Sequence, residues 1–213
     1  MSQTKVAVGM INATGTPGSG NFRRGDGTWN AAGSWNLIGS TTGSGASTLD
    51  ITGLTSTYKT YCIIGEDLVP GTDATIPWMR LGDSSGVDSG STDYGWCAHD
   101  GYMPTNAEAS NQVYDSVDQD NQDAQIEMMG NENGMGTGTR EAASFQAWLH
   151  RPQSSVGFAH VTGIIAVRGS HAYSLSPRFN GHLNAATTVD RVQFLMSSGT
   201  ISGTMTVWGI AHA

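Results

Sequence analysis

Histidine is the residue type most often used for acid–base catalysis and metal binding near neutral pH, and the chain contains six histidines. No two of them stand in the HExxH spacing of a zinc protease, and no GxSxG motif presents a serine nucleophile. His150 and His160 could share one face, but isolated histidines at the surface or at the core edge are the favoured interpretation. The sequence therefore predicts a protein without catalytic residues or cofactor, and not an enzyme.

Four aspartates are concentrated in the segment DSVDQDNQD, and clustered carboxylates suit hard cations such as Ca²⁺. The candidate calcium ligands are Asp115, Asp118, Asp120 and Asp123. Their spacing does not match an EF-hand loop. Counting from Asp118, the sixth position is Asp123 instead of glycine, and the twelfth is Met129 instead of glutamate. A solvated acidic loop is the favoured interpretation, and no metal is expected.

The segment GNENGMGTGTR, residues 130–140, is rich in glycine, as phosphate-binding loops are. It lacks the Gly-Lys-Ser/Thr sequence that holds phosphates, and it does not open a helix after a parallel strand. We interpret this segment as a flexible surface loop rather than a nucleotide site.

Aromatic residues are frequent in the loop-rich middle of the chain, and flat rings on a β-sandwich can bind sugars through apolar contact. The candidate glycan contacts are Trp78, Tyr94, Trp96 and Tyr102. The competing interpretation places Trp78 and Trp96 on strands in the core, and this interpretation is favoured.

Charge limits the partners that the chain can have. It carries 10 Lys and Arg against 18 Asp and Glu, a formal net charge of −8, and its densest basic site is the pair Arg23–Arg24. Because a phosphate backbone or an anionic membrane surface attracts clustered cations, neither nucleic acid nor membrane is an expected partner. No segment has the apolar length of a signal peptide or a membrane span, so folding in a reducing cytoplasm is expected, with Cys62 and Cys97 as buried free thiols.

Short strands are the elements that must position these residues. Glycine accounts for 29 of 213 residues and charged residues for only 13%, a composition that suits strands joined by turns. The strand candidates are residues 34–40, 47–54, 57–69, 74–83, 93–102, 141–151, 157–169, 172–184, 189–199 and 201–213. Their close spacing predicts an all-β fold, an antiparallel β-sandwich, with a jelly-roll as the favoured topology.

Turn residues and the alternation of apolar and polar residues predict two hairpins and one buried strand face. The segments TTGSGA and SSGTISG are expected to close hairpins, the first between residues 34–40 and 47–54 and the second between the last two strands. In the final strand Met205 and Val207 alternate with Thr206 and Trp208, which predicts one buried face.

The chain is expected to have two parts. Residues 1–33 form an extended, glycine-rich N-terminal arm in which KVAVGMI could make one short strand. Residues 34–213 form the sandwich, with long loops at about 103–140, where the sequence is polar and acidic and then rich in glycine.

The stretch from Asn21 to Trp29, NFRRGDGTW, resembles a short element that is widespread in tail-fibre proteins of tailed bacteriophages. That element reads approximately Thr-Phe-Leu-Arg-Gly-Asp-Gly-Thr-Trp and often follows a Gly/Pro/Ser stretch such as TGTPGSG. The chain departs from it at Arg23, where an apolar residue is usual. The C-terminal VDRVQFLMSSGTISGTMTVWGIA is similar to the ending of many phage β-sandwich virion proteins. We recognise no family resemblance in the middle of the chain.

The resemblance implies how the arm is used. A Gly-Asp-Gly turn suits residues at positive φ, and the residues expected to anchor the arm are Phe22, Arg24, Asp26 and Trp29. Because glycine loses much conformational entropy when it is ordered, such an arm needs a partner surface. By analogy with phage fibres, the expected partners are further copies of the chain, in a homotrimer, and other virion proteins.

The first functional expectation is therefore a non-enzymatic structural protein of a tailed-phage virion, a tail fibre or knob for assembly and for host attachment, with host surface glycan as a further partner. The alternative is a capsid decoration (cement) protein that stabilises the shell, which the shortness of the chain favours. A carbohydrate-binding module outside any virion is the third hypothesis. The first two place the protein in the virion after synthesis in the cytoplasm of the bacterial host.

Overall fold

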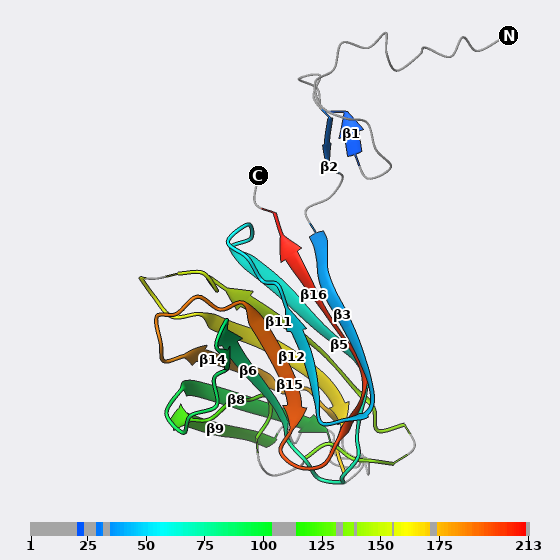
Figure 1. Ribbon diagram of the computed structural model, residues 1–213. Helices are drawn as coiled ribbons and strands as arrows, with labels where there is room; N and C mark the ends of the chain where they lie inside the picture. The colour runs from blue at the N-terminus through cyan, green and yellow to red at the C-terminus, as the bar shows by residue number, and fades with distance from the viewer. Residues whose placement is uncertain are drawn as a thin grey trace, which may run out of the picture. The chain divides into compact units, whose positions relative to one another are not determined.

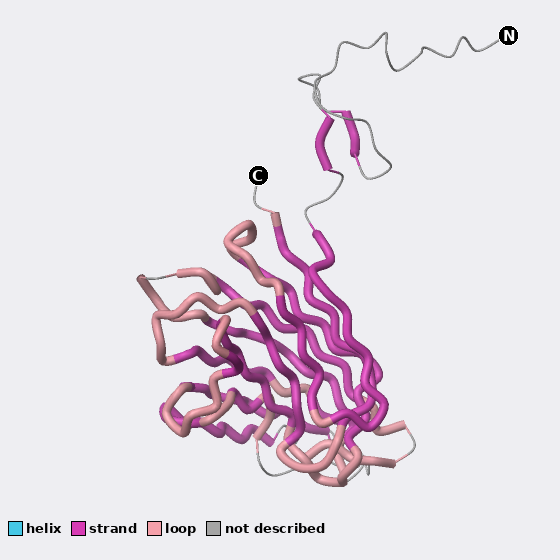
Figure 2. The backbone as a smooth tube through the Cα atoms, in the orientation of Figure 1, coloured by secondary structure: helices cyan, strands magenta, loops and turns pink. Residues whose placement is uncertain are grey.

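The computed structural model describes residues 21–23, 29–31, 35–103, 114–130, 134–138, 140–154, 156–170 and 174–211. These residues form sixteen strands and no helix (Figure 2), so the described part of the chain contains no helical segment that could cross a membrane. The chain divides into two compact units, Met1–Ser34 and Trp35–Ala213.

The first unit contains a two-stranded antiparallel sheet of β1 (Asn21–Arg23) and β2 (Trp29–Ala31), in which Arg23 lies opposite Trp29. Two of the predicted anchoring residues, Phe22 and Trp29, therefore have their backbones in paired strands. The other two, Arg24 and Asp26, lie outside the described residues, as does the strand expected in KVAVGMI.

The second unit consists of two antiparallel sheets. The larger has nine strands and the order β13-β8-β14-β12-β11-β5-β16-β3, with β9 paired to β8. Its strands are β3 (Trp35–Ala46), β5 (Thr60–Pro70), β8 (Tyr94–Met103), β9 (Tyr114–Asp123), β11 (Ala143–His150), β12 (His160–Arg168), β13 (Ser174–Leu175), β14 (Arg178–Leu183) and β16 (Ile201–Ile210). The smaller has the order β10-β6-β15-β4, with β7 paired to β6. Its strands are β4 (Thr48–Thr52), β6 (Pro77–Asp83), β7 (Gly86–Val87), β10 (Ile126–Glu127) and β15 (Arg191–Met196).

The two sheets pack face to face around one apolar core, so the predicted all-β antiparallel sandwich is confirmed. Figure 1 shows β6 and β15 lying over β11 and β12. At their interface Phe145 of β11 stacks on Phe194 of β15, with ring centroids 5.2 Å apart. The jelly-roll is a finer assignment that these strand orders do not establish, and it stays a prediction.

Alternation explains which face each strand buries. In β16 the side chains of Met205 and Val207 are fully buried, and Thr206 and Trp208 are partly exposed, as the sequence predicts. The same period of two runs through β11, β12 and β14, each with one face in the core and one face in solvent. The nine-stranded sheet therefore presents a broad outer face.

Neither predicted hairpin exists. TTGSGA belongs to β3, and β3 and the following β4 lie in different sheets. Likewise β15 belongs to the small sheet and β16 to the large one, so residues 197–200 cross from one sheet to the other. Gly199, at φ +78°, adopts the left-handed conformation within this crossing. Hydrogen bonds from Ser197 N to Ile76 O (2.8 Å) and from Gly71 N to Thr200 O (2.7 Å) hold the crossing in place.

The long loops predicted at 103–140 are shorter in the structure. The acidic segment forms strand β9, which pairs with β8 at the edge of the large sheet, where the side chain of Asp120 is exposed. The glycine-rich segment is not entirely a surface loop either. Met135 is fully buried, and its backbone forms bridges to Thr75 and Gly169. Residues 104–113, 131–133 and 139 lie outside the described residues.

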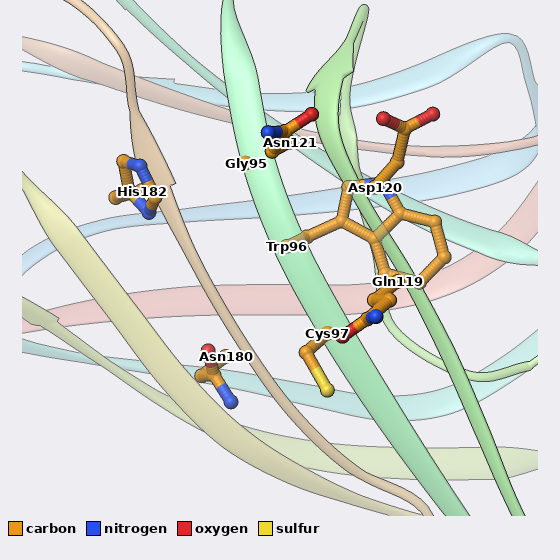
Figure 3. Close-up of a pocket in the computed structure, with 8 residues that line it drawn as sticks. All are labelled: Gly95, Trp96, Cys97, Gln119, Asp120, Asn121, Asn180 and His182. Carbon is orange, nitrogen blue, oxygen red and sulfur yellow. The ribbon is translucent and has the colours of Figure 1, made fainter.

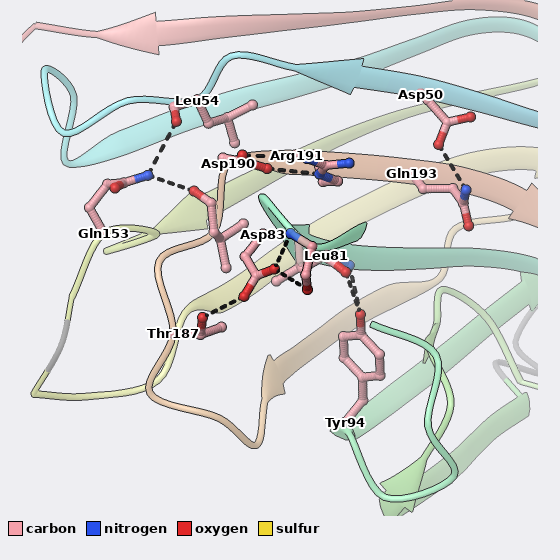
Figure 4. A network of polar contacts seen from close by, with 12 residues as sticks. Asp50, Leu54, Leu81, Asp83, Tyr94, Gln153, Thr187, Asp190, Arg191 and Gln193 are labelled. Atoms are coloured by element: carbon pink, nitrogen blue, oxygen red, sulfur yellow. Dashed lines mark hydrogen bonds and ion pairs between the residues drawn. The ribbon is translucent and has the colours of Figure 1, made fainter. Parts of the chain in front are cut away.

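Polar contacts tie the sheets to the connecting loops (Figure 4). The buried Tyr94 hydroxyl of β8 accepts a hydrogen bond from Leu81 N (2.8 Å) in the opposite sheet, and it lies 2.9 Å from Leu81 O, to which it can donate. The side chain of Gln153 donates to Leu54 O (3.2 Å) and Val189 O (2.6 Å), which fixes the loop after β11.

Candidate functional site

The outer face of the large sheet carries a row of side chains in cross-strand register. Starting at the β3 edge, each residue lies directly opposite the next: Leu37, Trp208, Cys62, Trp148, Thr162, Asn180, Cys97 and Gln119. Residues opposite each other on neighbouring strands have side chains on the same face. The row is thus apolar and aromatic at the β3 end and polar at the β9 end.

A hollow of about 510 Å³ lies at the polar end of this face, over β8, β9 and β14 (Figure 3). The residues that line it are Gly95, Trp96, Cys97, Gln119, Asp120, Asn121, Asn180 and His182. Gly95 is required for its shape, because a Cβ atom there would lie 2.7 Å from His182 Cε1. Asn184 holds β9 in place, since its amide donates to Asn121 O (3.2 Å) and Thr92 O (2.9 Å).

Two further hollows continue this one across the sheet. The second shares Asn180 with the first and is lined also by Gln146, Trp148, Thr162 and Arg178. The third shares Gln146 and Ile164 with the second and reaches Ile64 and Glu66 on β5. We call the three together the outer groove. It crosses β9, β8, β14, β12, β11 and β5, and its lining combines amides, hydroxyls and apolar surface.

The aromatic end of the outer face covers a buried thiol. Cys62 is fully buried between Trp148 and Trp208 on the neighbouring strands, and Gln146 Nε2 lies 3.5 Å from its sulfur. Burial raises the pKa of the Cys62 thiol. Trp35 packs edge-on against Trp148, with ring centroids 5.6 Å apart. The prediction of a buried free thiol is confirmed for Cys62, whereas Cys97 is a free thiol that lines the outer groove and is only half-buried.

Three histidines form a second cross-strand row at the end of the face. His150, His160 and His182 lie opposite one another on β11, β12 and β14, so the prediction of isolated histidines is wrong for them. His182 also stacks on Phe158, with centroids 5.4 Å apart. Burial, and secondarily the charge of His160, lower the pKa values of His150 and His182. At neutral pH, His182 is therefore an uncharged donor and acceptor beside the groove.

The aromatic residues predicted to bind glycan do not form one platform. Tyr94 is 0% exposed and lies in the core, so its prediction as a glycan contact is wrong. Trp78 is on the small sheet, where its Nε1 donates to Glu127 Oε1 (3.1 Å). Trp96 is 8% exposed and belongs to the apolar core, as the favoured interpretation predicts, although it also contributes to the lining of the outer groove. The side chain of Tyr102 lies outside the described residues.

The candidate calcium ligands lie on strand β9 and not on a loop. Asp123 accepts hydrogen bonds from Trp96 Nε1 (2.9 Å) and Gln125 Nε2 (2.7 Å), so both of its oxygens are engaged within the protein. Asp120 accepts from Gln122 N (2.9 Å). Among the side chains that the structure describes, no group of His, Cys, Asp and Glu could hold a metal ion. The side chains of Asp115 and Asp118 lie outside that description.

Sequence reasoning missed the residues that line the groove, above all Asn180, His182, Gln146 and Trp148. A usable signal was present, because each of them occupies an outward position of a strand that the sequence predicts correctly. What the sequence lacks is the order of the strands. Without that order, outward positions of β11, β12, β14 and β8 cannot be assembled into one surface.

The groove is chemically suited to binding a polyol. Amide groups of Asn180, Gln119 and Gln146 can each donate and accept hydrogen bonds, as hydroxyl groups require. Trp148 supplies a flat ring for the C–H face of a sugar, and Ile164 adds further apolar surface.

Comparisons with known proteins assign no family. No family model matches the chain, and no curated protein matches it. Among solved structures, a human SPRY domain aligns with 74% of this chain and 96% of its own length, at 12% identity and a TM-score of 0.19. That score is too low to carry an argument about fold or function.

Proposed function

We propose that the chain is a non-enzymatic attachment protein of a tailed-phage virion, a fibre- or knob-type subunit whose outer groove binds glycan on the host surface. The observation that carries the binding proposal is the continuity of the outer groove, in which Asn180 and Gln146 each belong to two successive hollows. An elongated polar groove fits several linked sugar units better than one compact ligand.

The assignment to a virion rests on the resemblance of NFRRGDGTW and of the C-terminal strands to phage proteins. In this proposal the N-terminal arm assembles three copies of the chain into a homotrimer and attaches the trimer to other virion proteins. The sandwich is then exposed for attachment to the host. A capsid decoration protein shares the arm and the sandwich, but it has no need of a sugar-binding groove. The groove therefore favours the attachment role.

Labelling of intact virions tests whether the protein lies on the tail or on the shell. Gold-conjugated antibodies against residues 35–211 are expected to mark the tail tip in electron micrographs and to block adsorption to host cells. Antibodies against the major capsid protein serve as the control for accessibility of the shell. Label on the shell would contradict the attachment role and support decoration. Absence of label from both shell and tail would overturn the virion assignment.

A further inference from the structure

A fourth hollow, separate from the outer groove, lies at one end of the sandwich. Its volume is about 390 Å³, and its lining residues are Ser56, Tyr58, Lys59, Arg151, Pro152, Gln153 and Ser154. Lys59 directly precedes β5 and Arg151 directly follows β11, and these strands are neighbours in the sheet. A hydrogen bond from Arg151 N to Lys59 O (2.9 Å) holds the two backbones together, so both cations come from one end of one strand pair.

The charge of this pocket is opposite to that of the protein. Two of the chain's 10 basic residues line it, no carboxylate does, and the chain as a whole carries a net charge of −8. Neither Lys59 nor Arg151 makes an ion pair in the described structure, whereas Arg191 pairs with Asp190 at 2.8 Å. Positive charges that no carboxylate of the pocket offsets attract an anion. The pocket therefore has unsatisfied capacity to bind negative charge.

Hydrogen bonds and packing hold the residues of the pocket wall in fixed positions. Gln153 is fixed by its two hydrogen bonds to backbone carbonyls (Figure 4), and Pro152 beside it is buried. Arg151 has a φ of +56°, a conformation that side chains rarely adopt, and its Nη2 lies 3.5 Å from Ser154 Oγ. On the other side Tyr58 packs edge-on against the buried Tyr61, with ring centroids 5.7 Å apart.

We propose that this pocket binds the anionic group, a carboxylate or a phosphate, of a charged sugar. Arg151 can form two parallel hydrogen bonds to such a group, and Lys59 adds a compact charge. The Ser154 hydroxyl is a further donor, and the half-buried Tyr58 ring offers apolar surface to the sugar that carries the anion. Two cations are too few for a nucleic-acid backbone, which favours a single anionic group as the ligand.

This site deepens the proposed function, because a bound anion would mean that the host glycan is negatively charged. Only the claim that a sugar carries the anion rests on the proposed function. The anion itself is tested by titrating the full chain with inorganic phosphate, with glucuronate and with uncharged glucose while amide NMR shifts are followed. We expect saturable shifts at the pocket with at least one of the two anions and none with glucose. Comparison of phosphate with glucuronate shows which anion is preferred.

Two variants and one matched control locate the binding. Lys59→Gln and Arg151→Gln are each expected to weaken the affinity roughly tenfold or more, because each removes a charge-assisted contact. Arg140→Gln is the control, since Arg140 is also exposed and has a positive φ, of 76°, but does not line the pocket. It is expected to leave the affinity unchanged. Lys59→Gln keeps the loop geometry, so it reports on the site even where Arg151→Gln disturbs the loop.

Three results would overturn the proposal: no saturable shift with either anion, equal affinity of Lys59→Gln and the unmodified protein, or an equal loss in Arg140→Gln. None of these bears on the outer groove, whose sugar binding is measured with other variants. Failure of the anion site and failure of the proposed attachment function can therefore be told apart.

Discussion

At the scale of single residues, Tyr94 shows how a polar group stabilises an apolar core. Its ring is fully buried between the sheets, and its hydroxyl interacts with both the N–H and the carbonyl of Leu81. Burial raises the pKa of this phenol, so it remains protonated and able to donate. Sequence reasoning detected the aromatic residue but not its burial, because aromatic residues suit binding surfaces and cores equally well.

Replacing Tyr94 by phenylalanine is expected to lower the free energy of unfolding by about 1–3 kcal/mol, because the Leu81 N–H loses its partner inside the core. Chemical denaturation at neutral pH measures this change. Tyr58→Phe is the control, since no hydrogen bond of the Tyr58 hydroxyl is present in the described structure, and we expect a change within about 0.5 kcal/mol. Equal stability of Tyr94→Phe and the unmodified protein would contradict the role given to the phenol.

At the scale of elements, the histidine row on β11, β12 and β14 makes the stability of the fold depend on pH. Because the folded pKa values of His150 and His182 lie below the ordinary value of 6.5, the unfolded chain binds more protons than the folded chain at mildly acidic pH. The stability that depends on these residues is complete above about pH 6.5. It is lost as the pH falls from there through the folded pKa values.

We therefore expect the melting temperature to fall between pH 7.5 and pH 5.5, a window near the ordinary pKa of histidine. A variant with both His150→Gln and His182→Gln is expected to lose most of this slope, because it no longer has the groups that titrate. Differential scanning calorimetry of the two proteins over this range measures the effect. An identical slope in both would show that other groups cause the pH dependence.

Sequence analysis found most strands but not how they connect. Alternation and turn residues locate β5, β11, β12 and β16, because these signals depend on near neighbours in the chain. The turns after β3 and β15 carry the same signals as hairpins, yet each leads to the other sheet. Only long-range packing decides whether such a turn closes a hairpin or leads to the other sheet. Strand β9 was missed because its aspartates oppose strand propensity, and an exposed sheet edge tolerates them.

At the scale of the whole molecule, strand order places the residues of the proposed binding groove on one face of the large sheet. Among the described residues of the second unit, the small sheet packs on the inner face of the large sheet, and the outer face carries aromatic residues near β3 and amides toward β9. The groove follows from strand order, and no single motif encodes it. Two of the chain's 10 basic residues, Lys59 and Arg151, line a separate pocket at one end of the sandwich.

The most direct test is the affinity of the purified protein for host surface polysaccharide, measured by isothermal titration calorimetry with two tryptophan variants. Asn180→Trp fills the junction of two hollows, and Thr52→Trp adds the same ring to an exposed position on the small sheet. We predict that the unmodified protein and Thr52→Trp bind equally, and that Asn180→Trp binds at least roughly tenfold more weakly. Binding by Asn180→Trp with unchanged affinity, or no binding by the unmodified protein, would contradict the account.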